Sequence, residues 1–430
     1  MRWTVFLLVP LFAGAPLAAQ SDGGLTLAEV YGSLTSSSPR IAAALAQAAA
    51  ARARIGPVSR WPDPAIQLGL MNRNLPGLGL QDPLGMNQIQ VMQMVPVAGK
   101  TGLAVKAARA DADAEDARAR EVGWEVRARA AMSFYDLYQA DHSLAAMAAA
   151  RRLLQDILRT TESMYAGGKG RQTDVLRAQV ELARMDEEIL GMTAMREGMA
   201  VRLNTLRGLA ADAPVPTPLL PRLPDSLPLR ETLETRALSD RPMLAAGQSR
   251  IASAEATARR ASREIWPDLT LGLIYGQRPM MGGGTERMGS FMLGFTLPLT
   301  AGSRQHQMTV EARAMAAMAT ADLEDMRTET RGRIGELHAD LTRAHHLAQL
   351  YHSTLLPQLR ATATAALSAY QSGGTDFMTL LDSQMAVIRA EQELFRFDAD
   401  AGKALAELEM LTATELMDPA SVAETSGGAR

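Results

Sequence analysis

Cysteine is absent from the 430 residues of this chain. Its absence excludes disulfides, thiolate metal sites, a thiol nucleophile and the N-terminal cysteine that would carry a lipid anchor. Motifs that carry chemistry are absent too, because the sequence has no glycine-rich phosphate loop, no HExxH zinc motif and no nucleophile elbow. We therefore expect no catalytic residues, no metal site and no cofactor, so that the protein is not an enzyme.

An excess of one charge is also lacking. The formal net charge is −3, and basic and acidic residues are mixed along the chain, so nothing predicts a nucleic-acid partner. Hydrophobic residues make up 47% of the sequence, which is enough to bury a sizeable core. The composition is therefore typical of a folded protein rather than a disordered one.

Long apolar runs are confined to the N-terminus. There Arg2 precedes the apolar residues 3–17 and the small pair Ala18-Ala19. This order is typical of a secretory signal peptide, and we expect residues 1–19 to be removed. Elsewhere no run of ~18 apolar residues predicts a transmembrane helix, so any contact with membrane lipid would have to be made by strands.

The sequence also repeats itself. Trp61-Pro62-Asp63 recurs as Trp266-Pro267-Asp268, a displacement of 205 residues (266 minus 61). The same displacement relates a second group, in which Tyr165, Gly168, Leu176 and Gln179 recur as Tyr370, Gly373, Leu381 and Gln384. A third pair of similar segments lies between them, at Val95–Lys100 and Leu297–Arg304. Similar segments in the same order predict two copies of one structural unit.

A proline-rich run separates the two copies. Residues 214–228 carry prolines at short intervals, and proline both lacks a donor N–H and favours extended backbone, so this run is predicted to be a linker. We accordingly divide the chain into repeat 1 at 25–213, repeat 2 at 229–417 and a flexible tail at 418–430.

Each repeat is predicted to contain a helix, two strands, a long helix, a glycine-containing turn and a returning helix. From Thr101 to Ala166 the sequence has no proline and is rich in alanine, which predicts one helix of roughly 65 residues and ~100 Å. A helix this long must lie against other long helices, in the manner of a coiled coil. In repeat 2 we expect a kink or break at Pro357.

Four amphipathic strands are predicted, at about 64–74, 86–96, 268–277 and 289–298. Leu269, Leu271, Leu273 and Tyr275 share one face, whereas the residues between them are mostly small. This alternation is typical of a transmembrane barrel strand, but a half-buried hairpin of a soluble protein shows it equally. Four strands cannot close a barrel and lipid tolerates no open edge, so membrane insertion would require several chains to pool their strands. Three chains would supply twelve.

Taken together, these segments resemble the TolC family of outer membrane efflux proteins over nearly the whole chain. The resemblance rests on the doubled Trp-Pro-Asp segments, the strand ends at Val95–Lys100 and Leu297–Arg304, and the turn segments that begin at Tyr165 and Tyr370. It implies a mainly α protein with a β-barrel segment, working as a homotrimer. Twelve pooled strands would form one barrel in the outer membrane, and the long helices would form one tunnel across the periplasm.

The resemblance also implies partners and a function. The partners would be a periplasmic adaptor (membrane fusion) protein and an inner-membrane efflux pump, and the function would be the passive export of small molecules, drugs or metal ions. The competing interpretation is a soluble periplasmic coiled-coil adaptor or scaffold, which would also have long helices and a secretory signal. Such adaptors usually carry one helical hairpin flanked by β-rich domains, whereas strands interrupt the helices twice in this sequence. We therefore favour the channel.

The resemblance places the tunnel entrance at the two glycine-containing turns. The candidate adaptor-contact residues are Gly167, Gly168, Gly373 and Gly374, and the candidate gate residues are Tyr165, Thr173, Asp174, Tyr370 and Asp382. Physically, one carboxylate from each of three chains would form an acidic ring that attracts cations. Asp174 can equally be explained as an acid favoured by the N-terminus of the returning helix. The two tyrosines can be explained as packing anchors.

Two further patterns invite a metal hypothesis. His338, His345 and His352 recur every seven residues, but this spacing is about 10.5 Å along a helix, too long for two of them to share an ion. The chain also has 25 methionines, several of them in or near the predicted strands. Thioethers bind soft metals, and heavy-metal exporters form one branch of the family, but methionine is also ordinary packing material. The sequence therefore leaves the exported substrate open.

Overall fold

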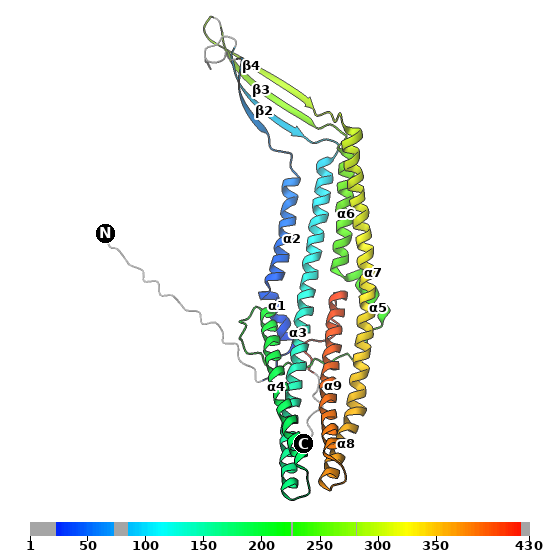
Figure 1. The fold of residues 1–430 in the computed structure, drawn as a ribbon. Coiled ribbons are helices and arrows are strands. Elements are labelled where there is room, and N and C mark those ends of the chain that lie inside the picture. The colour runs from blue at the N-terminus through cyan, green and yellow to red at the C-terminus, as the bar shows by residue number, and fades with distance from the viewer. Residues whose placement is uncertain (1–22, 73–84, 225–226, 281, 423–430) are drawn as a thin grey trace, which may run out of the picture.

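The computed structural model describes residues 23–72, 85–224, 227–280 and 282–422. The predicted signal peptide at 1–19 and residues 423–430 of the predicted tail lie outside these ranges, as do residues 73–74 of the first predicted strand. The described chain forms a long rod, with a four-stranded sheet at one end and two helical hairpins at the other (Figure 1).

Each repeat follows the predicted order of elements. Repeat 1 contains α1 (Leu27–Ser37), α2 (Pro39–Val58), β1 (Ala65–Met71), β2 (Met86–Val95), α3 (Lys100–Ala166) and α4 (Gln172–Arg207). Repeat 2 contains α5 (Arg230–Asp240), α6 (Pro242–Arg263), β3 (Leu269–Pro279), β4 (Thr285–Phe295), η1 (Ala301–Gln305), α7 (His306–Leu350), η2 (Tyr351–Leu355), α8 (Leu356–Gln371) and α9 (Phe377–Thr412). The prediction of a mainly helical protein with four strands in two repeats is confirmed.

The leading helix of each repeat is two helices rather than the single one predicted. α2 begins at Pro39 and α6 begins at Pro242. The residues before these prolines are extended, with ψ of 109° at Ser38 and 119° at Arg241. A proline disfavours helical backbone in the residue that precedes it, so each helix breaks at this point.

The long arms of the two repeats differ in construction. α3 runs without interruption for 67 residues, as predicted, which corresponds to about 100 Å. In repeat 2 the same arm passes through two π-helical segments, η1 and η2. η2 ends at Leu355, just before the predicted break at Pro357. A π turn takes up an extra residue within a helix, and the helical path continues past the proline instead of breaking.

The four strands form one antiparallel sheet in the order β1-β2-β3-β4. β2 and β3 pair across the two repeats, and Leu271 lies opposite Gln93 on one side and Leu293 on the other. One face collects the predicted apolar side chains: Ile66, Leu68, Leu70, Ile89, Val91, Val95, Leu269, Leu271, Leu273, Tyr275, Phe291, Leu293 and Phe295. Small, polar and methionine side chains occupy the opposite face, together with Ile274. The observed strand pairing therefore places the predicted apolar residues on one face of the sheet.

The hairpin of repeat 2 reaches farther toward its turn than predicted. β3 extends to Pro279 and β4 begins at Thr285, and an ion pair of 2.6 Å between Arg278 and Glu286 joins the two strands near this turn. At its other end β4 stops at Phe295 instead of residue 298. In the described part of the chain, no helix is both long enough and apolar enough to cross a bilayer.

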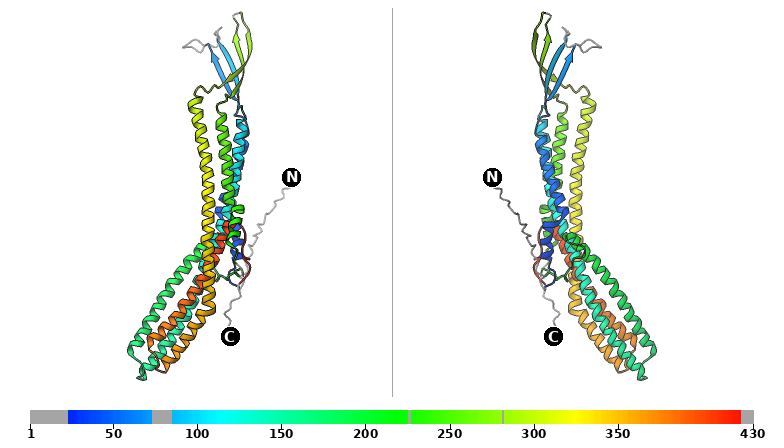
Figure 2. Two further views of the ribbon diagram at one scale, coloured as in Figure 1. Left: turned by 90° about the vertical axis from the view of Figure 1, so that its right-hand side faces the viewer. Right: turned by 90° about the vertical axis from the view of Figure 1, so that its left-hand side faces the viewer.

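Two hydrophobic cores hold the rod together. The larger core lies at its middle, where Phe134 and Tyr135 of α3 are fully buried among residues of α1, α5, α7 and α9. The smaller core lies within the tip hairpins and joins Leu154 of α3, Tyr370 of α8 and Phe377 of α9. Figure 2 shows that the tip hairpins lean away from the upper helices below the middle of the rod.

The N-terminal segment, the linker and the C-terminal segment meet at the middle of the rod. Leu25 N–H donates to Thr217 O (2.9 Å), and the Leu25 carbonyl accepts from Leu219 N–H (2.8 Å). Arg222 N–H donates to Ser421 Oγ (3.2 Å). The described part of the predicted flexible tail, residues 418–422, is therefore hydrogen-bonded to the linker.

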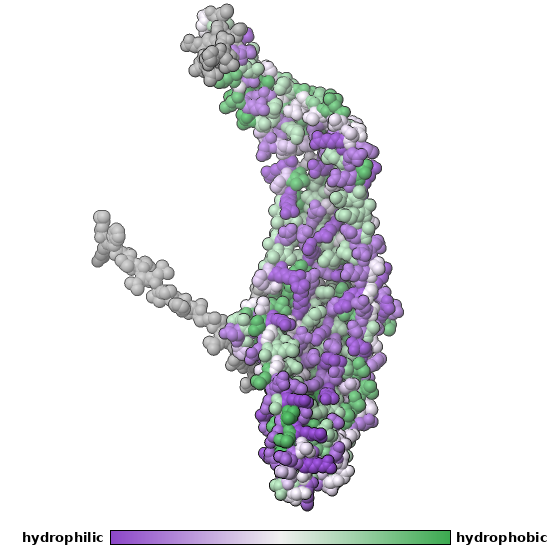
Figure 3. Space-filling view, in the orientation of Figure 1, coloured by the Kyte–Doolittle hydropathy of each residue, from purple (hydrophilic) through white to green (hydrophobic). Residues whose placement is uncertain are grey.

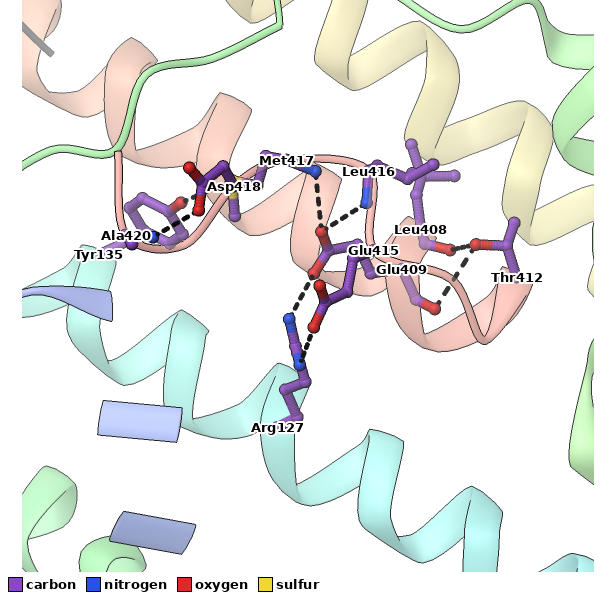
Figure 4. Close-up of polar contacts among 10 residues, drawn as sticks. All are labelled: Arg127, Tyr135, Leu408, Glu409, Thr412, Glu415, Leu416, Met417, Asp418 and Ala420. Atoms are coloured by element: carbon purple, nitrogen blue, oxygen red, sulfur yellow. Dashed lines mark hydrogen bonds and ion pairs between the residues drawn. The ribbon is translucent and has the colours of Figure 1, made fainter. Parts of the chain in front are cut away.

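Glu409 fixes the turn that follows α9 (Figure 4). Its side chain is almost fully buried, and its Oε1 accepts from Leu416 N–H (2.8 Å) and Met417 N–H (3.2 Å). Arg127 of α3 lies 3.9 Å from the other carboxylate oxygen and pairs with Glu415 at 2.6 Å. Burial raises the pKa of Glu409, and the two N–H groups and Arg127 oppose this rise. The carboxylate thereby ties the C-terminal segment to the long helix of repeat 1.

Candidate functional site

The two tip turns share one backbone geometry. Gly168 has φ of +68° and Gly373 has φ of +75°. The next N–H in each turn, from Lys169 or Gly374, donates to the carbonyl five residues before it, at 2.9 and 2.7 Å. Gly167 is the C-cap residue of α3. Left-handed backbone favours glycine, which explains the repeated Gly168 and Gly373, and both turns lie at the end of the rod farthest from the sheet (Figure 1).

The repeated tyrosines occupy opposite environments. Tyr370 is 5% exposed and its ring packs edge-on against Phe377, with centroids 5.9 Å apart. Tyr165 is 48% exposed. Tyr370 is thus placed as a packing anchor of the tip core, whereas Tyr165 presents its ring at the tip surface.

Asp174 and Asp382 lie on different helices. Asp174 is half-buried in the first turn of α4, beside the exposed Thr173, and Asp382 is exposed in the second turn of α9. α4 and α9 each pack along α3, and residues of both helices join the same tip core. Among the described residues neither carboxylate has a hydrogen-bond or ion-pair partner, which leaves both open to solvent or to another copy.

Sequence reasoning missed a third acidic residue at the tip. Asp376 is the N-cap of α9, and its Oδ1 accepts from the backbone N–H (3.0 Å) and the hydroxyl (2.5 Å) of Thr379. These bonds hold the pKa of Asp376 below its usual range, and the charge of Arg177 on α4 adds to the effect. The signal was present in the sequence, since Asp376 lies two residues after Gly374 and aspartate is among the residues preferred at a helix N-cap.

The sheet exposes a broad apolar surface in the single chain. The exposed fraction is 78% for Leu68, 63% for Leu273 and 66% for Phe291. Figure 3 shows hydrophobic residues gathered over this end of the molecule. Within the described residues, one edge of β1 and one edge of β4 have no neighbouring strand. Apolar surface and open edges of this kind mark a place where lipid or another chain binds.

The histidine pattern does not form a metal site in the described chain. His345 and His352 line an open pocket of about 580 Å³ together with Asp398. No group of three or more histidine, cysteine, aspartate or glutamate side chains that could hold a metal ion comes together among the residues described. On the sheet, Met92 and Met292 lie opposite Gly272 from its two sides, on the small and polar face.

Comparison with known proteins decides among the functions considered above. The family model described as outer membrane efflux protein matches residues 30–209 and again residues 233–414, one match in each repeat. The chain belongs to the outer membrane efflux protein family. Members of this family are non-enzymatic transporters, so this member is an efflux channel of the outer membrane. The alternative of a soluble adaptor or scaffold is set aside.

Individual relatives are distant but cover almost the whole chain. The cobalt-zinc-cadmium resistance protein CzcC of Cupriavidus metallidurans is 23% identical over 403 residues, which cover 90% of this chain and 92% of that protein. The outer membrane channel CmeC of Campylobacter jejuni superimposes with a TM-score of 0.77 at 12% identity, covering 97% of this chain and 96% of CmeC. The open state of the Neisseria gonorrhoeae MtrE channel gives a TM-score of 0.75 at 15% identity, covering 91% and 90%. At these identities the structural likeness shows the fold alone.

Proposed function

We propose that three copies of this chain form one efflux duct. In this proposal a periplasmic adaptor and an inner-membrane pump deliver the cargo to the helical tips, and the cargo leaves through the sheet end. The observation that carries the proposal is the four-stranded sheet, which in the described chain has one mostly apolar face, interrupted by Gln93, and two edges without a neighbouring strand. Lipid tolerates an apolar face but no unpaired strand edge, so the sheet is complete only within a ring of copies.

The number of copies follows from the need for a pore. Two chains would supply eight strands, and in a barrel of eight strands the interior is largely filled by its own side chains. Three chains supply twelve, which leaves room for a solute. Small side chains on the inner face, among them Gly272, Gly294 and Thr270, widen the path further.

Substitutions on the two faces of the sheet test which face contacts lipid. Leu271→Arg would place a charge on the apolar face at a cost of ~2–4 kcal/mol near mid-membrane, and we expect it to block assembly of the trimer. Thr270→Arg, one residue away on the opposite face, should assemble normally. Trimer in outer-membrane fractions would be measured on gels in mild detergent. Equal effects of both substitutions would contradict the assignment of the apolar face to lipid.

The leader belongs to the same proposal. Residues 1–19 would direct export and be removed, so the mature chain should begin close to Gln20. The intact mass of protein purified from outer membranes measures this directly. A mass that includes residues 1–19 would contradict the proposed signal peptide.

Divalent metal cations are the cargo class that we propose. Support comes from the similarity to a protein named for cobalt, zinc and cadmium resistance, which extends over 90% of this chain. The test is growth of a host strain that lacks this gene, with zinc, cobalt or cadmium and, in parallel, with a panel of drugs. Sensitivity to the metals that the intact gene reverses is the expected result. Sensitivity to drugs alone would overturn the metal assignment.

A further inference from the structure

Inside the chain, a buried lysine closes the junction between the two hairpins. Lys100 follows β2, and its Nζ lies 3.0 Å from Asp268 Oδ1, 3.3 Å from Glu264 and 2.9 Å from the carbonyl of Trp266. Asp268 also accepts from Val97 N–H at 3.2 Å. The basic residue after one hairpin thus binds the acidic residue that precedes the next, and Lys100 is only 6% exposed. We call this group the inner junction.

The same two positions recur at the free ends of the sheet, where they lack partners. Asp63 precedes β1 at the place that Asp268 has before β3, because Trp61-Pro62-Asp63 repeats Trp266-Pro267-Asp268. Arg304 follows β4 in the segment that resembles the one containing Lys100. Both side chains are exposed, and among the described residues neither has an ion-pair partner. One chain therefore contains the two halves of a second junction at opposite edges of its sheet.

We propose that Arg304 of one copy binds Asp63 of the next copy, and that this outer junction repeats the inner one around the ring. The inference rests on the proposed trimer. In a closed ring β4 of one copy lies beside β1 of its neighbour, as β2 lies beside β3 within the chain. The end of β4 then meets the segment before β1, so the arginine and the aspartate face each other across the subunit boundary.

The differences between the junctions support this pairing. The position of Glu264, the C-cap of α6, is taken in repeat 1 by Ser59, the C-cap of α2. The outer junction therefore has one acid for one base, whereas the inner junction has two acids around one lysine. Arg304 lies in the π segment η1, a few residues later than Lys100 lies in its own arm. Side chains on a helix point toward its N-terminus, and the longer arginine can span the additional distance.

The absence of native cysteine makes a cross-linking test direct. The variant Asp63→Cys with Arg304→Cys, treated with a short bismaleimide, should give cross-linked dimers and trimers on a denaturing gel. Either single-cysteine variant should give monomers only. The pair Lys100→Cys with Asp268→Cys should cross-link within one chain and migrate as a monomer. A protein that is trimeric in native gels but shows no ladder with the first pair would overturn the outer junction, and a monomeric native protein would overturn the trimer itself.

Charge reversal tests the ion pair separately from proximity. Asp63→Arg and Arg304→Asp each place like charges at the boundary, and each should speed dissociation of the trimer in detergent by roughly tenfold, because three junctions fail together. The double variant restores opposite charges and should recover most of the loss. Raising the salt concentration should narrow the difference between wild type and the single variants. Losses that simply add in the double variant would refute the pairing.

Discussion

The returning helices α4 and α9 are copies of one element in different surroundings. Both have 36 residues and follow tip turns with the same hydrogen bonds. α9 packs on α3, α7 and α8, whereas α4 packs mainly on α3. Accordingly Tyr370 and Phe377 close a core at the second tip, and Tyr165 at the first tip is exposed. The comparison teaches that the repeat preserves the backbone and that side chains diverge where one copy faces the inside of the chain and the other faces outward.

The largest difference in stability between the two tips is expected when each of the two repeated tyrosines is replaced by alanine. Tyr370→Ala empties a buried site next to Phe377 and should cost about 3–5 kcal/mol of stability. Tyr165→Ala changes an exposed side chain and should stay within about 0.5 kcal/mol. Thermal unfolding of the purified channel measures both. Similar losses for the two variants would mean that Tyr165 is buried against another copy, and the contrast would then belong to the single chain only.

Two glycines on the returning helices provide a second contrast. A Cβ at Gly402 of α9 would lie 2.3 Å from the ring of the fully buried Tyr135, whereas a Cβ at Gly198 of α4 would meet nothing within 4 Å. Gly402→Ala should therefore destabilise the rod by about 1–3 kcal/mol through overpacking. Gly198→Ala should stabilise α4 by roughly 0.5–1 kcal/mol, since alanine loses less backbone entropy in a helix. A neutral Gly402→Ala would show that the ring of Tyr135 moves aside without cost.

Much of the fold could be predicted from the sequence, but the different surroundings of the repeated residues could not. The displacement of 205 residues, the uninterrupted α3 and the alternation in the strands depend on local pattern, which one sequence displays. Tyr370 is buried and Tyr165 is exposed because different long helices surround the two tips, and the similar local sequences do not reveal this difference. The ion pair between Lys100 and Asp268 joins residues 168 positions apart, and no local sequence pattern predicts it.

Asp398 of α9 should make stability depend on pH, an effect that the corresponding Thr193 of α4 cannot produce. Burial raises the pKa of Asp398 to about 6. The native chain therefore keeps a proton that the unfolded chain releases near pH 4, so stability falls as pH rises from about 4 to above 6, by about 2–3 kcal/mol. Asp398→Asn should flatten this slope in melting temperatures measured between pH 4.5 and 8, and the slope that remains is expected from Glu409, whose pKa burial also raises.

Neighbouring titratable groups need a control in that experiment. His345 and His352 line the same pocket as Asp398, and Tyr138 of α3 feels its charge. A variant with His345→Gln and His352→Gln should keep the slope that Asp398→Asn flattens. A slope that disappears with the histidines and persists in Asp398→Asn would assign the pH dependence to the imidazoles.

Replacing Asp174 and Asp382 at the tips is expected to change stability least but to change ion conduction clearly. If Asp174 and Asp382 from three copies ring the tunnel entrance, Asp174→Ala with Asp382→Ala should raise single-channel conductance in planar bilayers and reduce cation selectivity. Stability should change little, since neither carboxylate has a partner in the described chain. The matched control is Glu187→Ala with Glu197→Ala, which removes the same charge from exposed positions farther along α4.

The alternative for Asp174 makes a different prediction. If this residue serves only the N-terminus of α4, the double variant should melt earlier and conduct ions as the wild type does. Asp376, whose carboxylate caps α9 through Thr379, shows what such a role looks like, and Asp376→Ala should lower the melting temperature of the tip. Unchanged conductance and selectivity in a trimeric double variant would remove both acids from the gate, and the tunnel entrance would then have to be closed by the helices themselves.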